Sequence, residues 1–195
     1  SIRRQRQMCI RDRTGTYALD PAHSSIGFTV RHAMVTKVRG EFTDFDATVT
    51  IAEEPSASTA SGTVRTASVD TRNADRDAHV RGEDFFAVEQ YPEMTFTATS
   101  FDVDAQGNGT VTGDLTIKTT TKPVTFDVET FGVEEDPFGN TRLGFEARTT
   151  INRSEYGIDF QAPLNSGGML VSEKVGIEIE AVSYTHLTLP TNREV

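Results

Sequence analysis

Apolar and polar residues alternate along most of this chain, which is the pattern of β-strands that bury one face. Ile26, Phe28 and Val30, for example, alternate with serine, glycine, threonine and arginine. The same two-residue period recurs over residues 38–51, 60–64, 94–103, 111–117, 124–133, 143–151 and 175–181. Turn-forming segments stand between these stretches, at residues 107–109, 119–123 (ending at Pro123) and 136–140. The pattern predicts about eight strands joined mostly by short turns.

The parity of the alternation changes inside two of these stretches. Val38 and Phe42 are apolar at even positions, whereas Phe45 and the residues up to Ile51 are apolar at odd positions. A change of parity within one strand requires an extra residue, so we expect a β-bulge near residues 43–44 that bends the sheet. A second shift precedes Phe131.

Residues 71–96 interrupt the strand pattern with signals for a helix. Asn73 or Asp75 can accept a hydrogen bond from a free backbone N–H and so begin a short helix. Charged residues then cover about two turns, and Phe85 and Phe86 follow in a second short turn. Pro92 ends the segment, because it has no N–H and disfavours helical backbone before it. This predicts a single helical crossover that either covers or plugs one end of the fold.

An all-β fold, an eight-stranded antiparallel barrel with one short helical crossover, accounts best for these features. Bulges and interior glycines suit a closed barrel, which leaves no strand edge exposed. A two-sheet sandwich with a filled core is the structural alternative. The distinction matters for function, because eight strands closed into a barrel leave just enough room for one ligand.

Composition and charge restrict the class of partner. The 195 residues suffice for one domain, and the formal net charge of −10 argues against a nucleic-acid partner and against an anionic membrane surface. Cys9 is the only cysteine, so neither an internal disulfide nor a thiolate metal cluster can form. The sequence has no apolar run of about 18 residues, so no membrane-spanning helix is expected.

Both ends of the chain differ from the body. Residues 1–14 carry five arginines against Asp12, and residues 183–195 do not continue the alternation of the preceding strand. Both segments resemble the translated read-through of sequencing adapters. We therefore predict one domain over residues 15–182, flanked by artefactual or disordered tails at 1–14 and 183–195.

The side chains that could carry chemistry are few. His23, His32 and His79 lack the spacing of a helical metal site, and no nucleophile elbow, phosphate loop or zinc-protease motif occurs. We expect no catalytic residue, no metal and no cofactor. Arg76 and Asp77 could hold a polar headgroup or form ion pairs that fix the crossover. The phenylalanines are core residues, unless a barrel with unfilled space turns them into ligand walls.

Several motifs, in one order, resemble the YceI-like family of lipocalin-like, polyisoprenoid-binding proteins. They are LDPAHSSIGFTVRHAMVTKVRGEF, SVDTRNADRDAHVRGEDFF, YPEMTFTATS, VTGDLTIKTTTKPV, DPFGN and INRSEYGI, and the resemblance covers about residues 15–182. Tyr156 stands where relatives often have Trp or Phe, and TTTKP replaces a Gly-Val-Thr-Lys-Pro segment. The resemblance implies an elongated, lipocalin-like barrel whose apolar tunnel holds a long isoprenoid chain.

Under this resemblance, ligand contacts are expected from the strand that follows the DPAHS segment, from the RDxH…DFF crossover and from the GDLT segment. The predicted ligand-binding residues are Phe28, Val30, His32, Phe42, Phe45, Arg76, His79, Phe85, Phe86, Phe96 and Leu115. The implied function is non-catalytic binding, storage or transport of a prenyl quinone or polyprenyl lipid.

Two alternatives from other classes stay open. An enzyme acting on an isoprenoid quinone would need a general acid or base, for which His32, His79 and Asp77 are the candidates. A structural or stress-response sandwich would bind no ligand. The RHAMVTKVRG stretch resembles cytoplasmic members of the family, and the alternative is a periplasmic or exported protein whose signal peptide is lost at the N-terminus. The sequence also leaves the oligomeric state open, with a homodimer as one option.

Overall fold

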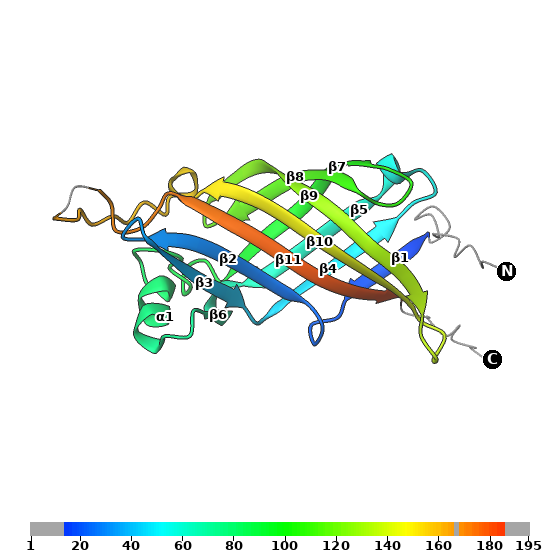
Figure 1. Cartoon of the computed structure of the whole chain (residues 1–195), viewed down its shortest axis with the longest axis horizontal. Coiled ribbons are helices and arrows are strands. Elements are labelled where there is room, and N and C mark those ends of the chain that lie inside the picture. The colour runs from blue at the N-terminus through cyan, green and yellow to red at the C-terminus, as the bar shows by residue number, and fades with distance from the viewer. Residues whose placement is uncertain (1–13, 166–167, 186–195) are drawn as a thin grey trace.

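A computed structural model describes residues 14–165 and 168–185 as a barrel of antiparallel strands with one short helix at its end (Figure 1). Most of the two predicted tails, residues 1–13 and 186–195, lies outside the described part of the chain. The strands are β1 (Gly15–Leu19), β2 (Ser25–His32), β3 (Thr36–Phe42), β4 (Phe45–Ile51), β5 (Thr59–Arg65), β6 (Val69–Asp70), β7 (Glu93–Val103), β8 (Gly109–Ile117), β9 (Thr120–Glu135), β10 (Thr141–Asn152) and β11 (Lys174–Thr185). The helix is α1 (Ala74–Arg81), and short 3₁₀ turns occupy η2 (Pro55–Ala57), η3 (Thr66–Ser68) and η4 (Arg153–Tyr156).

The sheet closes on itself, because β11 pairs with both β1 and β2 at different heights. Tyr17 of β1 lies opposite Thr185, whereas Thr29 of β2 lies opposite Gly176. β1 and β2 are therefore two halves of one bent strand. The same holds for β3 with β4 and for β5 with β6, which pair with one another half by half. The eleven hydrogen-bonded segments thus form a barrel of eight long strands, which confirms the predicted barrel and rules out the open sandwich.

The predicted bend near residues 43–44 is present, but it is not a one-residue bulge within a strand. Thr43 and Asp44 separate β3 from β4, and η3 interrupts the neighbouring strand at the same height. Backbone bonds from Thr43 N–H to Ser68 O (3.3 Å) and from Arg65 N–H to Asp44 O (2.9 Å) hold the two interruptions together. The parity change before Phe131 is confirmed as a bulge, because Gly144 faces Gly132 while Phe145 faces Thr130.

One predicted turn is misplaced. The turn between β8 and β9 consists of Lys118 and Thr119, where Lys118 has a left-handed φ of 56°. Residues 120–123 belong to β9, and Pro123 lies opposite Asp114 of β8. Proline is tolerated there because this stretch of β9 pairs with β8 alone, since the pairing of β9 with β10 begins at Asp127.

The crossover forms as expected, with Asn73 and not Asp75 as its N-cap. The Asn73 side chain accepts a hydrogen bond from the Arg76 N–H at 2.9 Å and so satisfies a free donor of the first turn. α1 lies at one end of the barrel, together with the β2–β3 turn and the loop that precedes β11 (Figure 1). In the described residues, no helix is long and apolar enough to cross a membrane.

The last strand extends three residues beyond the predicted domain end at residue 182. Ser183, Tyr184 and Thr185 pair with Leu19, Ala18 and Tyr17 of β1, and Ser183 is fully buried. Its hydroxyl donates to the Leu143 carbonyl at 3.3 Å. The alternation breaks here because the inward-facing residue at this position is a serine with its own hydrogen-bond partner, and not an apolar residue.

Shortening the chain at two neighbouring points tests this boundary. A chain that ends after Thr185 should keep the melting temperature of the full chain. A chain that ends after Val182 loses the β1–β11 pairing and the Ser183 bond, so its free energy of unfolding should fall by about 2–4 kcal/mol. Thermal and urea unfolding of both shortened chains measure the difference. Equal stabilities would show that residues 183–185 add nothing to the barrel.

Candidate functional site

The barrel encloses a cavity of about 660 Å³ that extends along most of its length. Its wall comes from the inward faces of nearly all the long strands, from the crossover and from the loop before β11. Phe28, Val30, Phe96 and Ile177 line it, and each is only half-buried although it belongs to an inward face. Residues that face the interior keep accessible surface only when space lies in front of them. The interior of this barrel is therefore a wall around a void.

Two glycines make room for aromatic rings in this wall. Gly40 lies opposite Phe28, and a Cβ at Gly40 would collide with the Phe28 ring. A Cβ at Gly113 would lie 2.5 Å from Phe96 Cζ and 2.5 Å from the Thr97 carbonyl oxygen. Each ring therefore occupies the space that the side chain of a larger residue would need at the neighbouring glycine.

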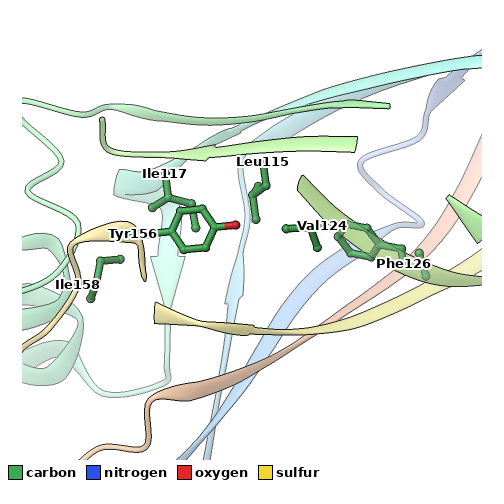
Figure 2. Packing of buried hydrophobic residues seen from close by; sticks show 7 residues of the cluster. Leu115, Ile117, Val124, Phe126, Tyr156 and Ile158 are labelled. Carbon is green, nitrogen blue, oxygen red and sulfur yellow. The ribbon is translucent and has the colours of Figure 1, made fainter. Parts of the chain in front are cut away.

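At the end of the barrel where α1 lies, the wall is closed by a tightly packed cluster of buried side chains. Tyr156 of η4 and Ile158 pack with the β8 and β9 residues Leu115, Ile117 and Phe126 in one buried cluster (Figure 2). Tyr156 is 2% exposed, and burial raises the pKa of its hydroxyl. This cluster anchors the start of the loop that runs to β11.

Ionisable residues that line the cavity gather at the end where α1 lies. They are His32, Asp75, Arg76, His79 and Arg153. Asp46 also borders the cavity, but it is exposed and bonded to Arg65 at 2.6 Å. The cavity therefore has one polar end and is largely apolar along the rest of its length, which suits a molecule with a polar head and a long apolar body.

A buried network fixes the beginning of the crossover. Asp77 is 7% exposed and accepts hydrogen bonds from the Thr71 N–H (2.8 Å) and the Thr71 hydroxyl (2.5 Å). Arg76 donates to the Thr71 hydroxyl from Nε (2.8 Å) and to the Thr71 carbonyl from Nη2 (2.7 Å). Burial alone would raise the pKa of Asp77, but the Thr71 bonds and the charges of Arg81 and Arg76 hold it below its ordinary value.

This network predicts an acid-sensitive contribution to stability. At neutral pH, the free energy of unfolding of the Asp77→Asn variant should be about 1–3 kcal/mol lower than that of wild type, because the hydrogen bonds from Thr71 lose their charged acceptor. Because the folded pKa lies below the unfolded value of 3.8, the contribution is present above that value and is lost as the pH falls through the folded pKa. Urea unfolding at neutral and acid pH should show the wild-type advantage shrinking in acid. If the stability difference between wild type and Asp77→Asn stayed constant with pH, the charge of Asp77 would not contribute to it.

Three rings meet where the crossover faces the loop. The His79 ring lies edge-on to Phe85 (5.1 Å between centroids) and to Phe160 (5.0 Å), and Phe85 lies 5.2 Å from Phe160. His79 Nε2 is also 2.8 Å from an Asp84 carboxylate oxygen. All three rings line the cavity, so this cluster forms its wall at the polar end.

Arg153 holds together the two ends of the loop that connects η4 to β11. It is 5% exposed, and its guanidinium donates to the carbonyl oxygens of Ser172 (2.9 Å), Ile158 (2.8 Å) and Val171 (3.2 Å). Burial lowers the pKa of Arg153, and the nearby charges of Glu173 and Asp159 partly offset this. Arg153 therefore links both ends of the loop and also borders the cavity.

Ten of the eleven predicted ligand residues line the cavity. Phe45 is the exception, because it is packed against Leu19 and Ala181 in a separate buried cluster just after the bend. Arg76 reaches the cavity, but two of its guanidinium nitrogens donate hydrogen bonds to Thr71. These bonds fix the crossover to the preceding segment. Whether the ten residues touch a ligand stays a prediction.

Other wall residues were not predicted as ligand contacts. Phe126, Ile177 and Ile179 belong to inward faces that the alternation had already identified, so the period alone could have added them. Val80 and Phe160 carry no such signal, because one sits on a short helix and the other in a loop. Only the fold brings Phe160 next to His79.

The outer wall carries a trio of glutamates. Carboxylate oxygens of Glu146, Glu178 and Glu180, which could bind a metal ion, lie within 4.8 Å of one another. Arg148 donates to Glu146 (3.2 Å) and to Glu178 (3.0 Å), so a cationic side chain already compensates two of the three charges.

Comparisons with known proteins agree with this architecture. The YceI-like domain family matches residues 17–183. A UPF0312 protein of Staphylococcus epidermidis is 38% identical over 167 residues, which cover 85% of this chain and 95% of that protein. A UPF0312 protein of Staphylococcus aureus is 37% identical over the same shares of both chains.

Solved structures show the same barrel. The YceI protein of Campylobacter jejuni superposes with a TM-score of 0.68 at 31% identity, over 86% of this chain and 96% of that one. BcnA of Burkholderia cenocepacia gives a TM-score of 0.68 at 26% identity, over 84% and 98%. A polyisoprenoid binding domain from Saccharophagus degradans gives 0.60 at 15% identity, over 87% and 97%, which is a likeness of fold. With a family match over residues 17–183 and a relative that is 38% identical and matched over 95% of its length, this chain belongs to the YceI-like domain family.

Proposed function

We propose that this protein binds one long-chain lipid of the polyisoprenoid class, such as a prenyl quinone or polyprenyl lipid, inside the barrel, and stores or carries it without changing it chemically. The observation that carries the proposal is the cavity of about 660 Å³, which is apolar along its length and has ionisable side chains gathered at one end. This volume lies within the range of about 300–1,000 Å³ that ligand pockets occupy. The isoprenoid binding stated for the Saccharophagus degradans domain concerns a barrel of the same fold.

The wall supports tight binding with few polar contacts. Each CH₂-sized unit removed from water contributes about 0.8 kcal/mol, so a chain of many such units gains affinity mainly from its apolar body. Aromatic and branched aliphatic side chains from opposite strands, such as Phe96, Leu115 and Ile177, would surround that body. The headgroup would lie at the polar end, near His32, Arg76 and His79, which fixes the direction of the lipid.

Two of the three candidate acid–base residues, Asp77 and His79, have contacts that support binding more than catalysis. Asp77 does not border the cavity, and its carboxylate is engaged by Thr71. His79 is held by Asp84 and by two phenylalanine rings, which suits a wall residue. A general base has to reach the proton that it removes, and these contacts leave Asp77 without that access.

Extraction of the purified full-length protein tests the proposal. Organic extraction followed by mass spectrometry should yield a lipid with a long isoprenoid chain, at about one molecule per protein chain. Lipid-free protein should take up an added prenyl quinone and return it unaltered. Protein that neither retains nor takes up such a lipid would overturn the binding function, and conversion of the quinone to a new product would overturn the non-catalytic role.

A further inference from the structure

We propose that the end of the barrel formed by residues 33–35 of the β2–β3 turn and residues 168–170 of the loop before β11 docks on an anionic phospholipid bilayer. This inference rests on the proposed function, because it names the surface from which a barrel that holds a membrane lipid would load and unload. The exposed side chains that carry it lie outside the cavity wall, so it can fail while lipid binding stands.

Exposed apolar side chains cluster at this end. Met34 is 64% exposed, Val35 78% and Met169 52%. The two segments that carry them touch, because the Ala33 N–H donates to the Leu170 carbonyl at 2.7 Å and the Met34 thioether lies against Gly168. Together they form one apolar tip, and Figure 1 shows that the β2–β3 turn and this loop lie at the same end of the barrel as α1. Contiguous exposed apolar side chains mark interaction sites more often than scattered ones do.

Two residues of the turn adopt a backbone conformation that is unfavourable for their side chains. Ala33 and Met34 have left-handed φ values of 51° and 62°. Glycine and asparagine adopt this conformation at lower cost than alanine or methionine. The turn therefore presents a large apolar side chain at a position where a small polar residue would be more stable.

The flank of this tip is basic although the whole chain is acidic. Residues 31–39 contain Arg31, Lys37 and Arg39 and no acidic residue, whereas the chain as a whole carries −10. Arg31 and Lys37 lie directly opposite each other on β2 and β3. Like charges in opposed positions destabilise a sheet, and in the described part of the protein none of these three side chains has an ion-pair partner. This combination of exposed apolar residues with unpaired cations fits the interface of an anionic bilayer.

The acidic body does not cancel this local charge. Charges further apart than the Debye length, about 8–10 Å at ordinary ionic strength, are largely screened. The nearest acidic residues lie on the barrel side of the tip: Glu173 follows Ser172, which exchanges two hydrogen bonds with the Arg31 backbone, and Glu41 lies two residues after Arg39 on β3. Residues 33–37 of the turn itself contain Lys37 and no acidic residue, so the net charge of the chain does not describe their local charge.

The tip adjoins the polar end of the cavity. His32, the last residue of β2, lines the cavity and forms a bridge with Val171, and Leu170 and Val171 line it as well. A bilayer against Met34 and Met169 would thus face the end where the headgroup is expected. A lipid could move between bilayer and barrel without crossing a wide layer of water.

Vesicle flotation of the full chain tests the docking surface. The probes are vesicles of phosphatidylcholine alone and of phosphatidylcholine with about one quarter phosphatidylglycerol. Wild-type protein should float with the anionic vesicles only. Replacing Lys37 and Arg39 by glutamine should lower the partition coefficient about 25-fold, because each basic residue near such a surface contributes about fivefold. Replacing Met34 and Met169 by serine should lower it several-fold.

Matched controls remove the same features elsewhere. Arg142→Gln with Arg148→Gln removes two cations from other parts of the barrel, and Phe131→Ser with Phe138→Ser removes two exposed apolar side chains, which are 61% and 84% exposed. Both controls should float like wild type, and all variants should keep the wild-type content of extracted lipid.

The other flotation and sedimentation outcomes overturn the docking surface. Wild-type protein that floats with neither vesicle, or controls that lose flotation as much as the tip variants, would remove its basis. Tip variants that change the sedimentation of the protein alone would show that the tip instead contacts a second copy of the chain. Lipid-free wild-type protein would count against the proposed function, whereas unselective flotation with lipid content intact counts against docking only.

Discussion

A tryptophan in place of Ile177 should abolish most of the lipid binding while the barrel stays folded. Ile177 lies opposite Phe28 across the β2–β11 pair, and both side chains line the cavity. The larger ring would take the space of about two CH₂-sized units of the bound chain, which corresponds to about 1.6 kcal/mol, or about 15-fold in affinity. Uptake of a prenyl quinone by lipid-free protein, measured by titration, gives the change directly.

Glu180→Trp is the matched control for this variant. Glu180 lies on the same strand, but it is exposed on the outer face, so the same ring would there meet solvent. Its lipid affinity should equal that of wild type, and melting temperatures should show both variants folded. Equal affinity of Ile177→Trp and wild type would mean that the lipid does not occupy this part of the barrel.

The barrel could be predicted from the sequence because its strands are amphipathic and its turns are short. Every inward apolar position of β2, β8 and β11 follows from the two-residue period alone. Closure was also predictable in kind, since bulges and interior glycines have little use in a flat sheet. The bend at residues 43–44 showed itself as a parity change, although the sequence could not tell that the neighbouring strand breaks at the same height.

The candidate site was less predictable, because several of its residues are defined by segments far apart in the chain. Phe45 has the same alternation signal as Phe42, but it follows the bend and packs against Leu19 and Ala181. Phe160 joins His79 only after the loop folds back over the crossover. Periodicity reports which face a residue occupies, and it cannot report whether that face meets neighbours or empty space.

The roles within the crossover also needed the fold. Arg76 and His79 were both predicted as ligand contacts, and both line the cavity. Arg76 also bonds to the hydroxyl and the carbonyl of Thr71, while His79 meets Phe85 and Phe160. One residue therefore fixes the crossover to the barrel, and the other contributes to the wall.

Truncating two phenylalanines of the wall should have unequal costs. Phe126 is 7% exposed and packs edge-on against Phe96 at 5.3 Å, so Phe126→Ala should lower the free energy of unfolding by about 3–5 kcal/mol. Phe28 is half-buried, with Phe42 at 5.5 Å on one side and the cavity in front. Phe28→Ala should cost only about 1–2 kcal/mol in lipid-free protein, because much of its surface has no packing partner to lose.

Urea unfolding of lipid-free protein, with the slope of the transition checked for constancy, measures both costs. Bound lipid should widen the cost of Phe28→Ala, since the chain then packs against the ring that the variant lacks. The same comparison with lipid bound therefore reports whether the lipid reaches Phe28. Equal and full-sized costs for both variants without lipid would mean that the Phe28 ring is packed on every side, and that the barrel has no open interior at that height.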